Sequence, residues 1–245
     1  MKSLTKILLA AVFLAAPGFT IAKPHPTIGV NYNDIVDRHL SGFNAVNVAG
    51  PFDVDIIQGN TESVKIEAPD DVMGHILTDV NNGVLKIYNK HDMWNWGNWF
   101  GFHKKILVHV VIKDVNNINI SGSGDVYFRN GLTANSLKLN ISGSGDMTGK
   151  VSVKTLESKI TGSGDMKLAG NAESSTVSVI GSGDFTARNL TTASTAVRVS
   201  GSGDAAVNAS DRLDAAVNGS GDISYSGSPK NVNKHKSGSG DISGH

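Results

Sequence analysis

The chain has 245 residues, and its 22 lysines and arginines balance 22 aspartates and glutamates, so its formal net charge is zero. A neutral chain lacks the basic excess that supplies affinity for phosphate backbones, so nucleic acid is not an expected partner. The chain contains no cysteine, which excludes a disulfide framework and a thiol-linked lipid anchor.

The first 22 residues are typical of a secretory signal peptide. Two lysines precede the apolar run Ile7–Ala16, which is followed by Pro17 and by small residues up to Ala22. An apolar run of roughly ten residues is too short to span a bilayer, which takes roughly 20. We therefore expect cleavage after Ala22 and export to the periplasm, the outer membrane surface or the medium, with no transmembrane span. Residues 23–41 form a lead-in.

One turn motif, GSGD, recurs in the C-terminal half and sets the architecture. Its aspartates are 18 to 21 residues apart. This period is too long for a nonapeptide calcium roll and too short for a propeller blade, so it indicates one coil of a parallel β-helix per repeat. The seven aspartates are Asp125, Asp146, Asp165, Asp184, Asp204, Asp222 and Asp241.

Alternating apolar positions flank each GSGD corner. The residues one and three positions after the aspartate, and five and seven positions before it, are apolar or small in nearly every copy. We therefore expect two inward-facing strands per coil, with glycines that let successive corners approach closely. The sequence predicts a β-solenoid over 42–230, with irregular coils at 42–117 and regular coils at 118–230. The segment 231–245 is expected to be a polar cap or tail.

The irregular N-terminal part is also rich in strand patterns. Gln58–Asn60 is typical of a hairpin turn, and Asp70–Val80 has the pattern of a short helix. The expected strands are Ala45–Val48, Phe52–Gln58, Ser63–Glu67, Val84–Asn89 and Ile106–Lys113.

Several of these segments together resemble a known family. The order FDVDIIQG, VKIEAP, GVLKIY, KILVHVVI and then serial SGSGD corners resembles the bacterial putative auto-transporter adhesin family with a head GIN domain, a group of unknown molecular function. The resemblance covers roughly residues 40–230. It implies an exported, nominally adhesive protein with an all-β fold, a single-stranded right-handed parallel β-helix. Parallel crossovers are in general right-handed, which agrees with this.

The aspartate column is the first candidate site. Carboxylates stacked about 4.8 Å apart repel by about 1 kcal/mol per adjacent pair in water, so they need compensation. Corner amides could donate to them, Arg129, Lys150 and Arg188 could neutralise some of them, or calcium could lie between coils. Turn-bonded corner residues are the simplest interpretation. A calcium ladder and a ligand-binding column are the alternatives, and no other cofactor is expected.

The second candidate lies between two predicted strands, where every tryptophan of the chain is found. Aromatic side chains in a glycine-containing loop can contact sugars or a protein partner, or can fold back as a cap over the solenoid. His91 and His103 flank the loop, but two histidines without a third ligand make a weak metal signal. The candidate contact residues are Trp94, Trp96, Trp99, Phe100 and Phe102.

Signatures of catalysis are missing from the sequence. It contains no zinc motif and no recognisable serine, histidine and acid arrangement, and GSGD lacks the lysine of a nucleotide-binding loop. We therefore expect a non-catalytic, adhesin-like protein that binds a surface polysaccharide or protein and could form homo-oligomers. A structural envelope protein without a ligand and a polysaccharide-active β-helix enzyme are the alternatives.

Overall fold

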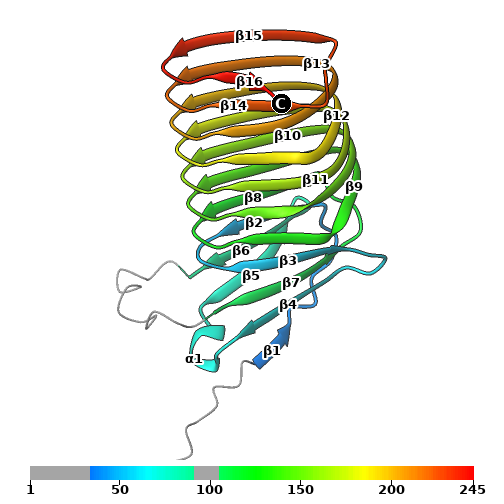
Figure 1. Ribbon diagram of the computed structural model, residues 1–245. Coiled ribbons are helices and arrows are strands. Elements are labelled where there is room, and N and C mark those ends of the chain that lie inside the picture. Colours follow the sequence, from blue (N-terminus) through cyan, green and yellow to red (C-terminus); the bar gives the residue numbers. More distant parts are fainter. Residues whose placement is uncertain (1–33, 91–104) are drawn as a thin grey trace, which may run out of the picture. The chain divides into compact units, whose positions relative to one another are not determined.

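The computed structural model describes residues 34–90 and 105–245, which belong to a single compact unit spanning 32–245. The predicted signal peptide and the tryptophan-containing loop lie outside these residues. These residues form a nearly all-β fold, 72% strand, arranged as a β-solenoid of about seven turns with ~19-residue coils (Figure 1). The all-β solenoid predicted from the repeat is thereby confirmed.

Each complete regular coil is one long strand of 15 to 18 residues. In β10 (Met147–Gly162) the inward alternation runs through Val153, and two exposed residues, Lys154 and Thr155, then follow in succession before Leu156 points inward again. This break divides the coil into a first leg, residues 147–153, and a second leg, residues 156–162. The GSGD corner then leads into the next coil.

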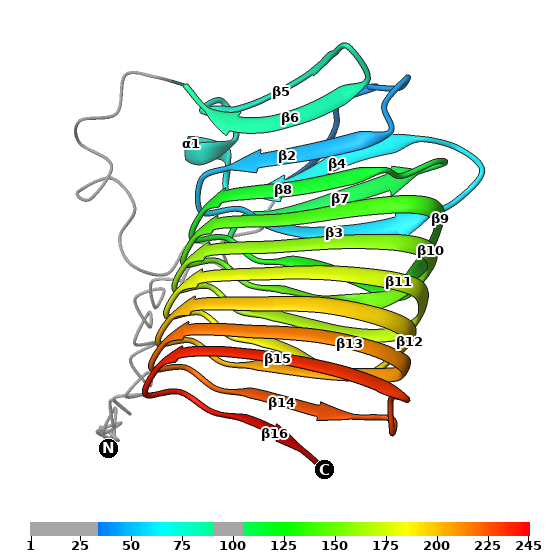
Figure 2. The same cartoon turned by 90° about the horizontal axis from the view of Figure 1, so that it is seen from above.

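Consecutive coils pair in parallel and almost in register. Met147 of β10 lies opposite Val126 of β9 on one side and Met166 of β11 on the other. First legs therefore stack on first legs and second legs on second legs, as Figure 2 shows from above. β9 to β13 each run through both legs, whereas β8 and β15 are second legs alone and β14 and β16 are first legs alone. The strands of the regular coils are β8 (Asn117–Gly122), β9 (Val126–Gly143), β10, β11 (Met166–Gly181), β12 (Phe185–Gly201), β13 (Ala205–Gly219), β14 (Ile223–Ser226), β15 (Asn231–Gly238) and β16 (Ile242–Gly244).

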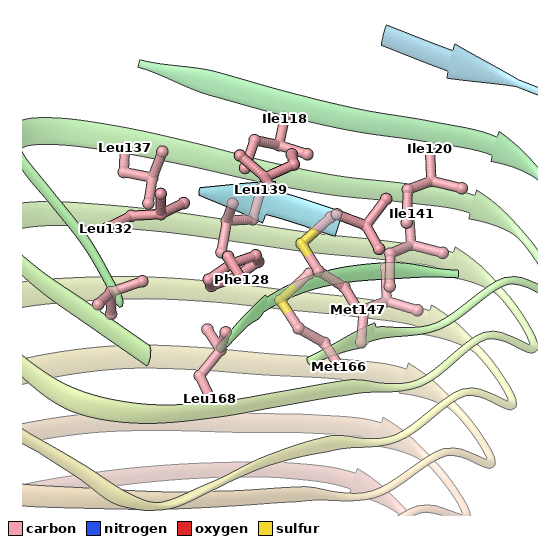
Figure 3. Close-up of a cluster of buried hydrophobic side chains, with 14 of the residues drawn as sticks. Ile118, Ile120, Phe128, Leu132, Leu137, Leu139, Ile141, Met147, Met166 and Leu168 are labelled. Carbon is pink, nitrogen blue, oxygen red and sulfur yellow. The ribbon is translucent and has the colours of Figure 1, made fainter. Parts of the chain in front are cut away.

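The core lies between the two legs. The inward positions expected from the repeat are buried except near the C-terminal end, where Tyr225 is partly buried. Figure 3 shows part of the resulting cluster around Phe128, Leu139 and Met147. Large and small residues interlock between coils: a Cβ on Gly149 would overlap the ring of Phe128, so the absent side chain makes room for the ring.

The N-terminal strands continue both stacks. On the second-leg side β2 pairs with β8 and β6, and on the first-leg side β3 pairs with β9 and β7. The predicted strands are present within one or two residues of their expected bounds. The elements are β1 (Asp34–Asp37), β2 (Ala45–Ala49), β3 (Asp53–Gln58), β4 (Ser63–Ala68), α1 (Asp70–Met73), β5 (Ile76–Asn81), β6 (Val84–Asn89) and β7 (Leu107–Ile112).

Two local predictions for this part are wrong. The helix expected over Asp70–Val80 is a single turn, α1, because Ile76–Asn81 pairs antiparallel with β6 instead. The hairpin expected at Gln58–Asn60 does not form, because β7 lies between β3 and β4 and pairs with both. In each case pairing with a strand distant in sequence overrides the local turn or helix signal.

The last coil carries polar residues at core positions. Lys234 and Lys236 stand in register with the inward residues Ala215 and Val217. The Lys234 ammonium donates to the carbonyl of Ile242 at 3.0 Å and lies 4.8 Å from the centre of the Tyr225 ring. Lys234 thus reaches across to the opposite leg. Within the described residues, no helix has the length and apolar character needed to cross a membrane.

Candidate functional site: the aspartate ladder and the outer face of the first legs

The two glycines of each GSGD corner are needed for different structural reasons. The first one, such as Gly143, has a positive φ of 138°, which disfavours any side chain. The second, such as Gly145, does not need a positive φ, but a Cβ there would overlap the carbonyl oxygen of Gly124 on the preceding coil. The Gly122 carbonyl accepts from the amides of Ser144 and Gly145, at 2.9 and 3.2 Å. Backbone-to-backbone contact therefore sets the stacking of the corners.

The corner aspartates form a continuous hydrogen-bonded column, which we call the aspartate ladder. The amide of each aspartate donates to the Oδ1 of the aspartate on the preceding coil, for example Asp165 to Asp146 and Asp184 to Asp165, both at 2.8 Å. The same bond recurs up to Asp241, whose amide lies 2.7 Å from the Oδ1 of Asp222. One carboxylate oxygen of each inner member is thereby used by the fold.

The ladder begins one coil earlier than the GSGD repeat. The amide of Asp125 donates to the Oδ1 of Asp53 at 3.3 Å, and the backbone of Gly124 approaches that of Phe52 closely. Residues 50–53, with the sequence GPFD, therefore form a corner without the second glycine. Asp53 is the site residue that the sequence prediction missed, and the signal that could have found it is the glycine three positions before an aspartate at a strand start.

Hydrogen bonding from corner amides is thus one compensation for the stacked charge, but the donor belongs to the next coil rather than to the same turn. Lysines lie at both ends of the ladder: Lys105 Nζ is 3.1 Å from Asp53 Oδ2, and Lys236 Nζ is 3.7 Å from Asp241 Oδ1. Tyr127 donates to the Oδ2 of Asp125 at 3.0 Å. Burial, followed by this hydrogen bond, raises the pKa of Tyr127 to about 12.

Basic side chains form a second column on the outer face of the first legs. Arg129, Lys150, Lys167 and Arg188 are exposed there, one on each of four successive coils. The column is staggered, because Lys167 lies opposite Thr148 and Thr186 and is two positions nearer its corner than the other three. Among the described residues none of them forms an ion pair with a ladder carboxylate. Arg129 instead lies over the Tyr127 ring, 4.9 Å from its centre, and Arg188 donates to the Ser224 hydroxyl at 2.9 Å. The expected direct neutralisation of the ladder by these bases is not present.

Two shallow depressions lie on this outer face. One, of about 390 Å³, adjoins the C-terminal part of the ladder, and its lining includes Asp184, Asp204, Asp222, Arg188 and His245. The other, of about 270 Å³, lies where β7, β3 and β9 are neighbours. Both place acidic and basic groups around one small volume.

The described residues do not establish the other two predicted sites, which are calcium between the coils and the aromatic loop. In residues 34–90 and 105–245 no group of three or more histidine, aspartate and glutamate side chains is arranged to hold a metal ion, and calcium between the coils remains a hypothesis. The aromatic residues Trp94, Trp96, Trp99, Phe100 and Phe102 lie outside the described residues, as do His91 and His103. Their contact with a ligand stays a prediction.

The fold and the ladder together define a class: a β-solenoid whose repeated glycine corners carry one aspartate per coil. Residues 42–229 match the family described as putative auto-transporter adhesin, head GIN domain, and the chain belongs to this family. The resemblance drawn from the SGSGD corners is confirmed. No curated protein matches the chain.

Solved structures show the same architecture. A putative adhesin from Bacteroides fragilis is 27% identical with a TM-score of 0.79, covering 86% of this chain and 96% of its own. A putative lipid binding protein from Parabacteroides distasonis and a putative adhesin from Parabacteroides merdae are each 22% identical, with TM-scores of 0.69 and 0.68. Each covers 89% of this chain and 98% of its own, and at this identity they show the fold alone. The description of the family names adhesion and no enzymatic activity.

Proposed function

We propose that this chain is an exported, non-catalytic adhesive module that binds a neutral surface polysaccharide along the outer face of its first legs. The observation that carries the proposal is the pair of parallel columns on this face. The aspartate ladder forms one edge, and the basic side chains of Arg129, Lys150, Lys167 and Arg188 form the other. Within the described chain the two columns are not paired with each other.

Two adjacent columns of opposite charge favour a neutral, hydroxyl-rich ligand. A polyanion would be repelled by the ladder, and a polycation by the basic column. A sugar hydroxyl can donate to a carboxylate and accept from an ammonium or guanidinium group, so one neutral chain satisfies both columns. In the ladder the second carboxylate oxygen is the available acceptor, because the first already accepts an amide.

The solenoid repeat also suits a polymer. The coils place equivalent groups at about 4.8 Å intervals along the stack. Weak contacts that recur along one rigid face add up to high avidity when the ligand is itself a repeating chain. The family is described by adhesion, which agrees with multivalent contact to a surface.

The test is direct binding of the mature chain, residues 23–245, to immobilised neutral polysaccharides, measured by biolayer interferometry. Two variants address the columns: Asp184→Asn with Asp204→Asn and Asp222→Asn, and Lys150→Gln with Lys167→Gln. Asparagine keeps an acceptor for the neighbouring amide, so the first variant should fold. Each variant should weaken binding about tenfold or more, because hydrogen bonds to charged groups are lost.

The matched control is Lys154→Gln with Glu173→Gln, which changes two exposed charges at the corner between the legs. It should bind like the parent. Binding only to polyanions, or equal loss in the control, would overturn the proposal. Absence of binding to any polymer would favour a structural envelope protein, and release of sugar products would favour an enzyme.

A further inference from the structure

The smaller depression, at the N-terminal end of the same face, has a lining unlike that of the ladder. It has a volume of about 270 Å³ and is lined by Asp55, Ile57, His109, Tyr127, Arg129 and Asn130, together with Ile56. Asp55 lies opposite His109 on one neighbouring strand and opposite Tyr127 on the other. Neighbouring strands lie about 4.8 Å apart, so these three side chains form one row across three strands.

Some polar groups of this row are already engaged. The Tyr127 hydroxyl donates to Asp125, and the guanidinium of Arg129 stacks on the Tyr127 ring. His109 Nε2 lies 3.6 Å from a carboxylate oxygen of Glu67, on the far side from Tyr127. These contacts hold the aromatic ring and the imidazole in place.

Other groups of the depression are left available. Among the described residues, the Asp55 carboxylate and the Asn130 amide have no hydrogen-bond or ion-pair partner, and Arg129 has no carboxylate partner. The Ile57 side chain is 44% exposed and adds an apolar surface. One small volume therefore combines a free acceptor, free donors, an aromatic ring and an aliphatic patch.

We propose that this depression binds a single neutral, hydroxylated sugar ring. Sugar hydroxyls can donate to Asp55 and accept from Arg129 and Asn130. The C–H face of the ring can pack on Ile57 and the exposed part of Tyr127. The volume lies just below the range of about 300–1,000 Å³ for drug-sized ligands, which fits one ring rather than a larger molecule.

The charge distribution disfavours the other small ligands. Asp55 lines the depression together with Arg129, and the Asp125 carboxylate is bonded to the Tyr127 hydroxyl, so a free anion such as phosphate would meet negative as well as positive charge. A divalent cation would need six or more oxygen ligands, and Asp55 supplies the only carboxylate among the described residues that line the depression. A neutral polyol is compatible with both signs of charge.

This inference rests on the proposed function, because the ring would be one unit, such as an end unit, of the bound polysaccharide. The sugar site and the adhesive function can still be refuted independently of each other. Short sugars whose binding depends on Asp55 and Arg129 test the smaller depression, because a single ring cannot follow the columns over several coils. Polymers test the whole face.

The experiment is saturation-transfer NMR and titration of the mature chain with glucose, galactose, mannose and N-acetylglucosamine. At least one sugar should bind, and Asp55→Ala and Arg129→Gln should each weaken its binding about tenfold. The control Lys154→Gln removes an exposed charge at the turn between the legs, outside both the depression and the basic column, and should bind the sugar like the parent. Thermal midpoints by circular dichroism check that the variants fold.

The outcomes separate the two proposals. If polymers bind but no monosaccharide does, or if both depression variants bind sugar like the parent, the sugar site is refuted and the adhesive function stands. If a sugar binds with the expected variant effects but no polymer does, the sugar site stands and the extended face is refuted. Stronger binding of phosphate or of a free amino acid would also overturn the sugar site.

Discussion

The backbone amide of Asp204 lies 2.8 Å from the Oδ1 of Asp184, one coil earlier. The two residues are 20 positions apart in the sequence, yet they occupy equivalent corner positions on successive coils. The aspartate is therefore both an acceptor for the coil that follows it and a donor to the coil that precedes it. This bond explains why the corner carries an aspartate beside two glycines, and why like charges can be stacked.

The ladder bond leads to a prediction for Asp184. The Asp184→Ala variant removes the acceptor of the Asp204 amide and should lower the free energy of unfolding by about 1 kcal/mol, the usual net value of one hydrogen bond. The Asp184→Asn variant keeps an acceptor and removes one charge between two carboxylates, so it should be at least as stable as the parent in low salt. Urea unfolding measures both, and an Asn variant less stable than the Ala variant would contradict the ladder's role.

The close approach of the corners leads to a second prediction. A methyl group at Gly145 would overlap the carbonyl oxygen of Gly124, and backbone cannot move aside as a flexible side chain can. Gly145→Ala should therefore cost about 3 kcal/mol or more, at the upper end of overpacking effects. Thermal unfolding should show a drop of about 10 °C.

Gly74→Ala is the matched control for Gly145→Ala. Gly74 has a φ of −70°, and a methyl group added there would meet no other atom within 4 Å, so the change should be neutral or stabilise by about 0.5 kcal/mol. Similar losses in both variants would mean that corner contact does not decide the stability.

The regular coils could be predicted because their signal repeats. The period of the aspartates and the alternation around Met147 or Val199 depend only on local geometry, which is the same in every coil. Asp53 escaped prediction because Phe52 stands where the second glycine of the motif is expected. The strand Ile76–Asn81 was not predicted because its hydrogen bonds go to β6, and its sequence alone does not exclude a helix.

The candidate depressions were beyond sequence reasoning for a different reason. Asp55, His109 and Tyr127 are separated by 54 and 18 residues, and only the parallel pairing of β7, β3 and β9 places them in one row. No repeat relates them. The ladder could be predicted as a column, but its bonding pattern required the coil-to-coil register.

A third prediction concerns calcium. One oxygen of each inner ladder carboxylate already accepts an amide, which leaves too few oxygens per corner for a coordination number of six to eight. The thermal midpoint of the mature chain, followed by far-UV circular dichroism, should therefore be the same in calcium and in a chelator. A large drop in chelator would instead establish a calcium ladder, and the Asp184→Asn variant should then lose part of that difference.

The final prediction concerns pH and Tyr127. Its pKa of about 12 lies above the ordinary tyrosine value of about 10, because burial and the hydrogen bond to Asp125 favour the neutral phenol in the folded chain. A raised pKa of this kind stabilises the fold fully below pH of about 10, and the stabilisation is lost as the pH rises toward 12. The stability advantage of the parent over Tyr127→Phe should shrink over this interval in urea titrations.

Tyrosinate absorbance provides the direct readout for the same residue. The difference between the parent and Tyr127→Phe should be a single titration near pH 12. A difference spectrum is needed because the hydrogen bond of Tyr88 to Asp79 also raises the pKa of Tyr88. The Tyr225→Phe control should retain the late titration of Tyr127. If the difference between the parent and Tyr127→Phe titrates near pH 10 instead, the Tyr127 hydroxyl does not hold its bond to the ladder in solution.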